Sequence, residues 1–249
     1  MPRVLIIAGS DSGGGAGIQA DIKTVTMLGG HATTAITAIT AQNTLGVQSV
    51  HGVPVETVLA QIDSVLGDIG ADAVKIGMIG SAEIAHAVAD RLAELAVPIV
   101  FDPVMIATSG SVLADAGTIA AFARLMALAG VVTPNLPELA ALGGRDAVLA
   151  YGCNLAEKGG HAEGDTIVDR LWSPDGLVRE TRGARIDTTS THGTGCTFAS
   201  ALATGLGAGL AIGEAFDRAV EFVRRALIAA PGLGQGHGPM GQQFVTGFR

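Results

Sequence analysis

Two patterns of apolar residues alternate along this chain, and together they predict strands followed by helices. Residues 3–8 begin with Arg3 and continue as an unbroken apolar run, which is typical of a strand buried on both faces of a parallel sheet. In residues 16–28 the apolar positions recur instead at helical spacing, so that Ile18, Ile22 and Val25 share one face. The start of the chain therefore predicts a strand, a turn and a helix.

The same alternation continues toward the C-terminus. It predicts further strands over residues 32–40, 73–78, 97–101 and 131–132, and a hairpin of strands 166–172 and 177–180 around a Ser-Pro-Asp-Gly turn. It predicts further helices over residues 55–69, 82–95, 114–129, 196–206 and 212–230. The Gly-rich stretch 231–249 predicts a loop. Repeated strand–helix units indicate one α/β domain over residues 1–249, with a mostly parallel sheet between two layers of helices.

Six polar segments follow predicted strands or precede the late helix, where open parallel sheets bind their ligands. Because the carboxyl ends of parallel strands meet at one edge of a sheet, we expect these segments to converge. They are Gly9-Ser10-Asp11, Gln42-Asn43, residues 75–78, Asp102-Pro103, residues 133–135 and residues 192–196.

Charge and composition narrow the range of partners. The net charge is −8, and no cluster of Lys or Arg is present to engage the phosphates of nucleic acid or an anionic membrane, so neither is expected as a partner. No run reaches the roughly eighteen apolar residues of a membrane span. The two cysteines form no disulfide framework, which suits a reducing cytoplasm.

Residues 191–196, Thr-His-Gly-Thr-Gly-Cys, directly precede an apolar helix and carry the strongest chemical signal. The glycines allow a tight turn, and the free amides of a helix N-terminus attract anionic groups such as a phosphoryl group in transfer. Cys196 would lie in the first helical turn, where the dipole lowers the pKa of a thiol and favours the thiolate. A thiolate there could take the proton of an attacking hydroxyl. The alternative is a small buried hydrophobic residue without a chemical role.

Residues 9–17, Gly-Ser-Asp-Ser-Gly-Gly-Gly-Ala-Gly, partly match the phosphate-binding turn of dinucleotide-binding folds. The run is longer and less regular, and no acidic residue follows the next strand at the place of a ribose-binding carboxylate. We therefore interpret it as backbone that wraps a small polar substrate or as a flexible turn.

Two further segments could serve a metal ion and phosphates. Asn135 and Glu138 could lie in the first turn of a helix, where their oxygens suit Mg²⁺ and where their spacing equally fits a capping box. Lys158, followed by two glycines, could place one positive charge near phosphates, or it is a solvated strand end. No zinc-ligand cluster, nucleophile elbow or Walker A loop is present in the sequence.

Taken in order, seven segments resemble the hydroxymethylpyrimidine/phosphomethylpyrimidine kinases of the ribokinase-like superfamily. The similarity extends over nearly the whole chain, and the ordered set is specific although each segment alone is weak. The segments are residues 8–23 (AGSDSGGGAGIQADIK), 38–44 (AITAQNT), 75–78 (KIGM), 102–105 (DPVM), 133–138 (TPNLPE), 158–161 (KGGH) and 191–197 (THGTGCT).

The resemblance implies ATP-dependent phosphorylation of 4-amino-5-hydroxymethyl-2-methylpyrimidine and then of its monophosphate, for thiamine biosynthesis. It implies a three-layer α/β/α sandwich that uses Mg²⁺ and forms a homodimer, and it leaves the use of K⁺ open. The roles implied at matching positions are Cys196 as the base, with Gly193, Thr194 and Gly195 as the anion hole; Gln42, Met78, Val104 and Gly9 around the pyrimidine, with Asp21 near the phosphates; Lys158, Asn135 and Thr191 at the nucleotide; and Glu138 at the metal.

Three features depart from the family pattern. Thr108 stands where the family usually has Lys, the segment 142–151 is short enough to trim a helix, and the strand before Lys158 carries Asn154 and Glu157. Two alternative functions stay open. One is a pyridoxal or pyridoxine kinase of the same superfamily, and the other is a catalytically silent protein that binds the pyrimidine or the nucleotide.

Overall fold

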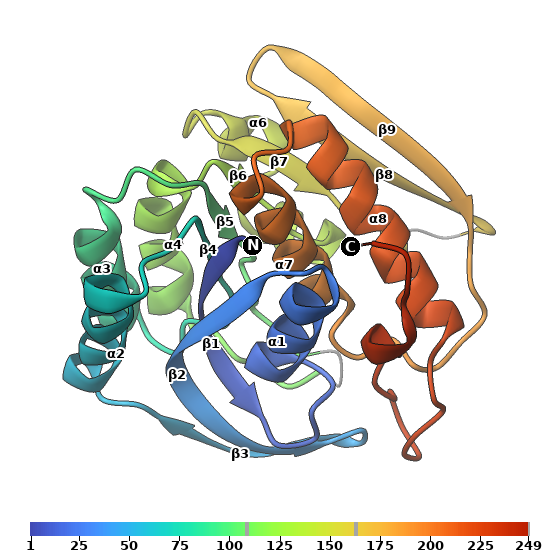
Figure 1. Cartoon of the computed structure of the whole chain (residues 1–249), viewed down its shortest axis with the longest axis horizontal. Coiled ribbons are helices and arrows are strands. Elements are labelled where there is room, and N and C mark those ends of the chain that lie inside the picture. The colour runs from blue at the N-terminus through green and yellow to red at the C-terminus, as the bar shows by residue number, and fades with distance from the viewer. Residues whose placement is uncertain (108–109, 162–163, 249) are drawn as a thin grey trace.

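The structure, a computed structural model, describes residues 1–107, 110–161 and 164–248. Within this part of the chain nine strands form a sheet in the order β3-β2-β1-β4-β5-β6-β7-β8-β9 (Figure 1). The six strands from β2 to β7 in this order run parallel, whereas β3 and the β8–β9 hairpin pair antiparallel. The strands are β1 (Arg3–Asp11), β2 (His31–Asn43), β3 (Gly46–Gly52), β4 (Ala73–Ile76), β5 (Ile99–Phe101), β6 (Val131–Val132), β7 (Asn154–Glu157), β8 (Thr166–Ser173) and β9 (Gly176–Ala184).

Helices cover both faces of the sheet, so the predicted three-layer α/β/α sandwich is confirmed. In Figure 1, α2, α3 and α4 lie on one side of the central strands, and α1, α7 and α8 lie on the other. The helices are α1 (Gly17–Met27), α2 (Val55–Asp68), α3 (Ala82–Leu92), α4 (Ala116–Leu128), α5 (Leu136–Ala141), α6 (Arg145–Leu149), α7 (Thr194–Gly207) and α8 (Ile212–Ile228).

Strand β1 shows why the apolar run at the N-terminus predicts a central strand. Val4 and Ile6 pack against the layer of α1, α7 and α8, whereas Leu5 and Ile7 pack against the layer of α2, α3 and α4. All four side chains are fully buried. Because successive side chains of a strand point to opposite faces, a strand between two helical layers needs apolar residues at every position.

Every predicted strand and helix is present, with ends that differ from the prediction by four residues at most. The edge strand β3 was missed, since most of its residues are exposed and an edge strand needs no apolar pattern. The C-terminal stretch is largely loop, as predicted, with one short 3₁₀ turn (Gln242–Phe244).

The two departures that lie within the described residues have structural explanations. β7 forms despite its polar ends, because Asn154 donates to the carbonyl of Gly130 at 2.8 Å and Glu157 accepts from the indole N–H of Trp172 at 3.1 Å. The short segment 142–151 retains only the five-residue helix α6. Among the described residues, no helix is both long and apolar enough to span a bilayer.

Candidate active site

A cavity of about 690 Å³ opens at the edge of the sheet where the parallel strands end. Its walls come from the ends of β1, β2, β4, β5, β6 and β7, from the start of α7 and from one side of α8. The predicted convergence is therefore confirmed. Every predicted site residue except Asp21 lines this cavity: Gly9, Gln42, Met78, Val104, Asn135, Glu138, Lys158, Thr191, Gly193, Thr194, Gly195 and Cys196.

Asp21 is the exception, and the prediction that it lies near phosphates is wrong. Its side chain is fully buried, pairs with the Lys75 ammonium at 2.9 Å and accepts a hydrogen bond from the Ser200 hydroxyl at 2.7 Å. The reason is helical geometry, since Asp21 lies one turn beyond Gly17 on the side of α1 that packs on α7. Asp21 therefore belongs to the interior beneath the cavity.

The start of α7 presents backbone N–H groups to the cavity. Gly193, the N-cap, has a φ of +83°, and a Cβ there would lie 2.0 Å from the carbonyl oxygen of Gly15. Glycine is thus required both by the left-handed backbone and by the close packing of the glycine-rich loop. Because Gly193 has no side chain to cap the helix, no side chain occupies the first amides of α7, although the Thr194 amide makes a long contact of 3.4 Å with the Thr191 carbonyl; amides at a helix start suit an anion.

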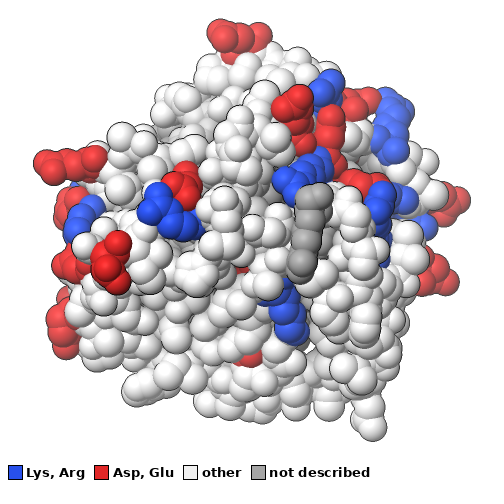
Figure 2. All heavy atoms as spheres, in the orientation of Figure 1, with Lys and Arg blue, Asp and Glu red and all other residues white. Residues whose placement is uncertain are grey.

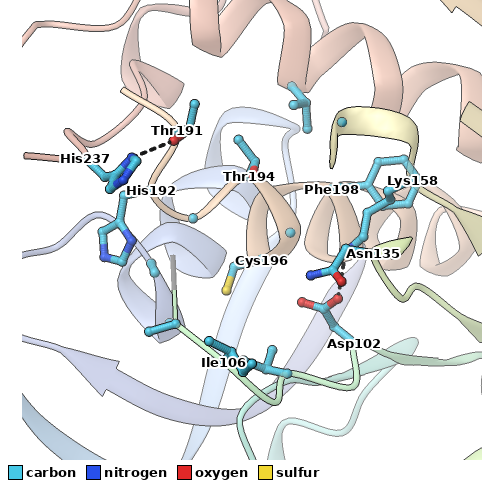
Figure 3. Close-up of a pocket in the computed structure, with 18 of the residues that line it drawn as sticks. Asp102, Ile106, Asn135, Lys158, Thr191, His192, Thr194, Cys196, Phe198 and His237 are labelled. Carbon is cyan, nitrogen blue, oxygen red and sulfur yellow. Dashed lines mark hydrogen bonds and ion pairs between the residues drawn. The ribbon is translucent and has the colours of Figure 1, made fainter. Parts of the chain in front are cut away.

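Cys196 lies in the first turn of α7, and its sulfur points into the cavity (Figure 3). The expectation that the helix dipole lowers its pKa is wrong in direction. Burial raises the pKa of the Cys196 thiol to about 12, and the nearby Lys75 ammonium offsets only part of that rise. Desolvation of a charged sulfur outweighs the dipole here, so the resting side chain at neutral pH is a thiol.

Lys158 forms an ion pair at 2.9 Å with Asp102, a residue for which the sequence suggested no role (Figure 3). The hydroxyl of Thr133 donates to the same Asp102 oxygen at 2.9 Å. A Cβ on Gly195 would lie 3.2 Å from the Lys158 ammonium, so the pair stands directly beside the anion-binding turn of α7. Of the two interpretations of Lys158, the structure favours a positive charge at the site over a solvated strand end.

Asn135 and Glu138 form the predicted capping box at the start of α5. The Asn135 side chain accepts from the Glu138 amide at 2.9 Å, and the Glu138 carboxylate accepts from the Asn135 amide at 2.8 Å. The capping interpretation is thus confirmed, while both residues also line the cavity.

The Glu138 carboxylate also fits a cation. Burial, together with the charge of Asp102, raises the pKa of Glu138 to about 7, although Lys158 opposes the rise. A bound cation would lower the free-energy cost of keeping the buried Glu138 carboxylate charged. Among the described residues, no group of three or more His, Cys, Asp or Glu side chains could hold a metal. A carboxylate that shares a site with phosphates and water suits Mg²⁺, which rarely has an all-protein cage.

The glycine-rich loop is filled by its own aspartate rather than open to phosphate. The Asp11 carboxylate accepts from the amides of Gly13, Gly15 and Ala16 at 2.8–3.0 Å. Burial opposes its charge, but hydrogen bonds from His192 and from these amides lower the pKa of Asp11. The amides that a dinucleotide-binding turn would offer to phosphate are therefore already occupied.

His192 connects this loop to Gln42. His192 Nε2 lies 2.9 Å from an Asp11 carboxylate oxygen and 3.1 Å from the side-chain nitrogen of Gln42. The Gln42 side-chain oxygen lies 3.2 Å from the Thr40 hydroxyl, and this contact holds Gln42 at this end of the cavity. No sequence pattern predicted a role for Asp11 or His192, although both belong to segments that were expected to converge here.

A group of aliphatic side chains in the cavity wall, close in sequence to the charged lining residues Asp169, Arg185 and Arg224, was also missed. Its side chains come from β8, from the segment before α7 and from α8, and no local pattern links them. They are Ile167, Ile186, Val220, Val223 and Leu227. Thr191 lies near the start of α7, where its hydroxyl contacts His237 Nδ1 at 3.2 Å (Figure 3). The departure at Thr108 lies outside the described residues.

Most of the chain matches known kinases. Residues 11–241 match the model of the phosphomethylpyrimidine kinase family. The hydroxymethylpyrimidine/phosphomethylpyrimidine kinases of Streptomyces coelicolor and Rhizobium meliloti are each 46% identical, covering 99% and 95% of this chain and 96% and 95% of theirs. By contrast, the chain spans 36% and 52% of the thiamine biosynthesis proteins ThiED of Corynebacterium efficiens and Geobacter sulfurreducens, at 40% and 46% identity.

Solved structures show the same fold. Bacillus subtilis pyridoxal kinase in an ADP complex has a TM-score of 0.89 and 32% identity, covering 98% of both chains. Clostridium difficile phosphomethylpyrimidine kinase has a TM-score of 0.77 and 36% identity, covering 91% of this chain and 99% of that one. The fold is therefore ribokinase-like, and the chain belongs to the phosphomethylpyrimidine kinase family.

Proposed function

We propose that this chain transfers the γ-phosphoryl group of ATP to 4-amino-5-hydroxymethyl-2-methylpyrimidine and then to its monophosphate, for thiamine biosynthesis. The observation that carries the proposal is one cavity that is lined by the first turn of α7 with Cys196, by Lys158 and Gln42, and by aliphatic side chains of β8 and α8. The names of relatives that match over nearly their full length support the same activity.

The pyrimidine would occupy the part of the cavity near Gln42. Gln42 would form hydrogen bonds with the ring substituents, while Met78 and Val104 would pack on its faces. Gly9 leaves room for the Met78 side chain in this wall, since a Cβ at Gly9 would lie 2.7 Å from the terminal carbon of Met78. A polar contact between apolar walls is typical of sites for small heteroaromatic ligands.

ATP would extend from the side chains of β8 and α8 to the start of α7. The aliphatic side chains of β8 and α8 suit the adenine ring, and Lys158, Asn135 and Thr191 would lie along the phosphates. Glu138 would hold Mg²⁺, which supplies charge neutralisation on the phosphates when bound. Running the assay below in K⁺ and in Na⁺ buffers tests monovalent cation use.

In the reaction, the substrate hydroxyl oxygen bonds to the γ-phosphorus as the bond to the bridging oxygen of ADP breaks. Cys196, as thiolate, would take the hydroxyl proton, and a thiolate of high pKa is a strong base once formed. The amides of Gly193, Thr194 and Gly195 would bind the phosphoryl oxygens, whose charge they stabilise in the transition state.

The test is ADP production by the purified protein with Mg-ATP and, separately, the pyrimidine, its monophosphate and pyridoxal. We expect turnover on both pyrimidines and little on pyridoxal. Turnover on pyridoxal alone would overturn the proposal, and tight pyrimidine binding without any turnover would indicate a silent binding protein.

Two substitutions test the assigned roles. Cys196→Ala should lower kcat by about 10²-fold or more, whereas Cys153→Ala, at a buried thiol outside the cavity, should leave kcat unchanged. Gln42→Ala should mainly raise KM for the pyrimidine. Normal turnover in Cys196→Ala would remove Cys196 as the base, and an unchanged KM would place the pyrimidine elsewhere.

Pyridoxal phosphorylation is the second candidate activity. The observation in its favour is the TM-score of 0.89 to a pyridoxal kinase over 98% of both chains. The same assay decides between the two, because it compares turnover on pyridoxal with turnover on the pyrimidine at equal enzyme concentration.

We also propose a homodimer without nucleic-acid or membrane partners, in the cytoplasm. On the face in Figure 2, Lys and Arg side chains are interspersed with Asp and Glu, and the net charge is −8.

Leu45 and Val50 expose 65% and 50% of their surface at the open edge formed by β3. Sedimentation analysis should find a dimer that Leu45→Glu weakens, and a monomer in the unchanged protein would contradict this.

A further inference from the structure

A cluster of charged side chains lies sealed beneath the floor of the cavity. Lys75, on β4, and Asp21, on α1, pair at 2.9 Å, and neither side chain has any exposed surface. Ser200, on α7, donates to the second carboxylate oxygen of Asp21 at 2.7 Å and is equally buried. None of the three lines the cavity, so none can touch a ligand there.

Helical spacing places this cluster directly below Cys196. On α7, Ser200 follows Cys196 by four residues, and on α1, Asp21 follows Gly17 by four residues. Residues four apart lie on the same face of a helix, one turn from each other. The two helices pack together, and the Gly17 amide lies near enough to the Cys196 sulfur to lower the pKa of its thiol. The upper turn thus holds Gly17 and Cys196, and the lower turn holds Asp21 and Ser200.

The space around the ammonium is closely matched to it. Lys75 points toward the helical layer of α1 and α7, because its neighbours Val74 and Ile76 pack on the opposite face of the sheet. A Cβ on Gly77 would lie 2.6 Å from the Lys75 nitrogen. The ammonium is therefore confined next to the backbone at the end of β4, where the cavity begins.

Stability alone does not account for such a pair. Taking two charges out of water costs several kcal/mol for each ion, and well-packed hydrophobic replacements of buried ion pairs are often neutral or stabilising. The surrounding layer is mostly apolar, and its other buried polar side chains, such as Thr24, Thr197 and Thr204, are uncharged. A buried ion pair one turn below the Cys196 thiol therefore calls for a functional explanation.

Four charged groups act on the Cys196 thiol from the elements packed around it. Lys75 and Lys158 favour the thiolate, whereas Asp21 and Asp102 oppose it. Of these, the Lys75 charge lowers the pKa of Cys196 the most. Burial alone would lower the pKa of Lys75, but the negative charges around it raise that pKa, so the ammonium stays charged at neutral pH.

We propose that Lys75 is a positioning residue that supplies, from beneath the cavity, the positive charge against which Cys196 becomes a thiolate, while its ion pair with Asp21 holds Lys75 in place. The inference deepens the proposed function, because it rests on Cys196 acting as the base. Lys75 never touches substrate in this arrangement, and its effect reaches the reaction through the sulfur alone.

Alkylation of Cys196 by iodoacetamide tests the proposal without any turnover, because the thiolate is the reacting species. An opposite charge at short range commonly changes a pKa by about one to three, and each whole number is a factor of ten in thiolate. At about pH 9, below the thiol pKa, Lys75→Met should therefore slow alkylation by roughly tenfold or more. Peptide mass spectrometry would follow Cys196 and Cys153 separately.

Three controls separate charge from packing. Ser200→Ala removes a hydrogen bond to Asp21 but keeps both charges, so its Cys196 rate should stay near that of the unchanged protein. The double variant Lys75→Met, Asp21→Leu replaces the pair with apolar groups, and it should also react more slowly because Lys75 acts on the thiol more strongly than Asp21. Cys153, buried elsewhere, should react at one rate in all variants unless a fold has loosened.

An unchanged Cys196 rate in both Lys75→Met and the double variant, with Cys153 still protected, would overturn the proposal. If the chain had no kinase activity on any pyrimidine, the alkylation result would still stand as a measurement of the thiol. If kinase activity were present and the alkylation rates of Cys196 were unchanged, only the role assigned to Lys75 would fail, and the proposed function would stand.

Discussion

Two lysine–aspartate pairs flank the start of α7, and they differ in one respect. Lys75–Asp21 and Lys158–Asp102 are both 2.9 Å long, and both lysines lie on or directly after a strand of the parallel sheet. The first pair has no exposed surface, whereas Lys158 keeps 16% of its side-chain surface exposed in the cavity. The same lysine–aspartate pair thus occurs once in the interior and once in the wall of the cavity.

The comparison separates two ways in which a positive charge can serve phosphoryl transfer. A lysine in the cavity can release its aspartate and bind phosphate oxygens directly, as a mobile point charge. A sealed lysine can act only through its field, which is stronger in a medium of low dielectric constant. We therefore expect Lys158 to govern ATP binding and Lys75 to govern the proton transfer.

Loss of the cavity lysine should have the largest effect. Lys158→Met should lower kcat/KM for ATP by about 10²-fold or more, because a contact to the phosphates disappears and Asp102 is left near them. Steady-state kinetics with varied ATP measure this, with melting temperature as a check on folding. A normal KM for ATP would contradict a phosphate contact.

Loss of the buried lysine should have a smaller effect, and the effect should fall on kcat rather than on KM for ATP. Lys75→Met should lower kcat on the hydroxymethylpyrimidine by about tenfold, since the base forms less readily, and should leave KM for ATP unchanged. The same kinetic series run on both variants gives the comparison. A rise in KM for ATP in Lys75→Met would mean that the substitution disturbs the cavity itself.

The second phosphorylation sharpens the contrast further. The monophosphate attacks through an oxygen that is already anionic, because the second pKa of a phosphate monoester is about 6, so no base is needed. Lys75→Met and Cys196→Ala should therefore reduce turnover of the monophosphate far less than turnover of the alcohol, whereas Lys158→Met should reduce both. Equal losses on the two substrates would remove proton transfer as the affected step.

An exposed pair should show the smallest effect of all. Arg3 and Asp72 pair at 2.6 Å with 42% and 32% of their side-chain surface exposed. Hydrogen bonds from Arg3 lower the pKa of Asp72 to about 2. The stabilisation is therefore complete above the usual pKa of Asp, near 4, and is lost as the pH falls toward 2. Arg3→Ala should lower the urea midpoint slightly at pH 7, and high salt should abolish the difference.

The sequence determined the architecture and the place of the site, because both depend on local patterns. Apolar runs and helical spacing predicted the order of strands and helices. The carboxyl ends of parallel strands lie at one edge of the sheet, however far apart the strands are in the sequence. The position of Cys196 in the first turn of α7 followed from the glycines before it. The capping box of Asn135 and Glu138 likewise depends on residues three apart.

The tertiary structure alone decided which side chains meet and what their surroundings do to them. Asp21 pairs with Lys75 and Ser200, which lie 54 and 179 residues away in sequence, so no local pattern could predict it. The carboxylate of Asp11 fills the glycine-rich loop from within, and the cost of burying a charge reversed the expected pKa shift of Cys196. Contacts and desolvation are properties of the packed core, and the linear order of residues does not contain them.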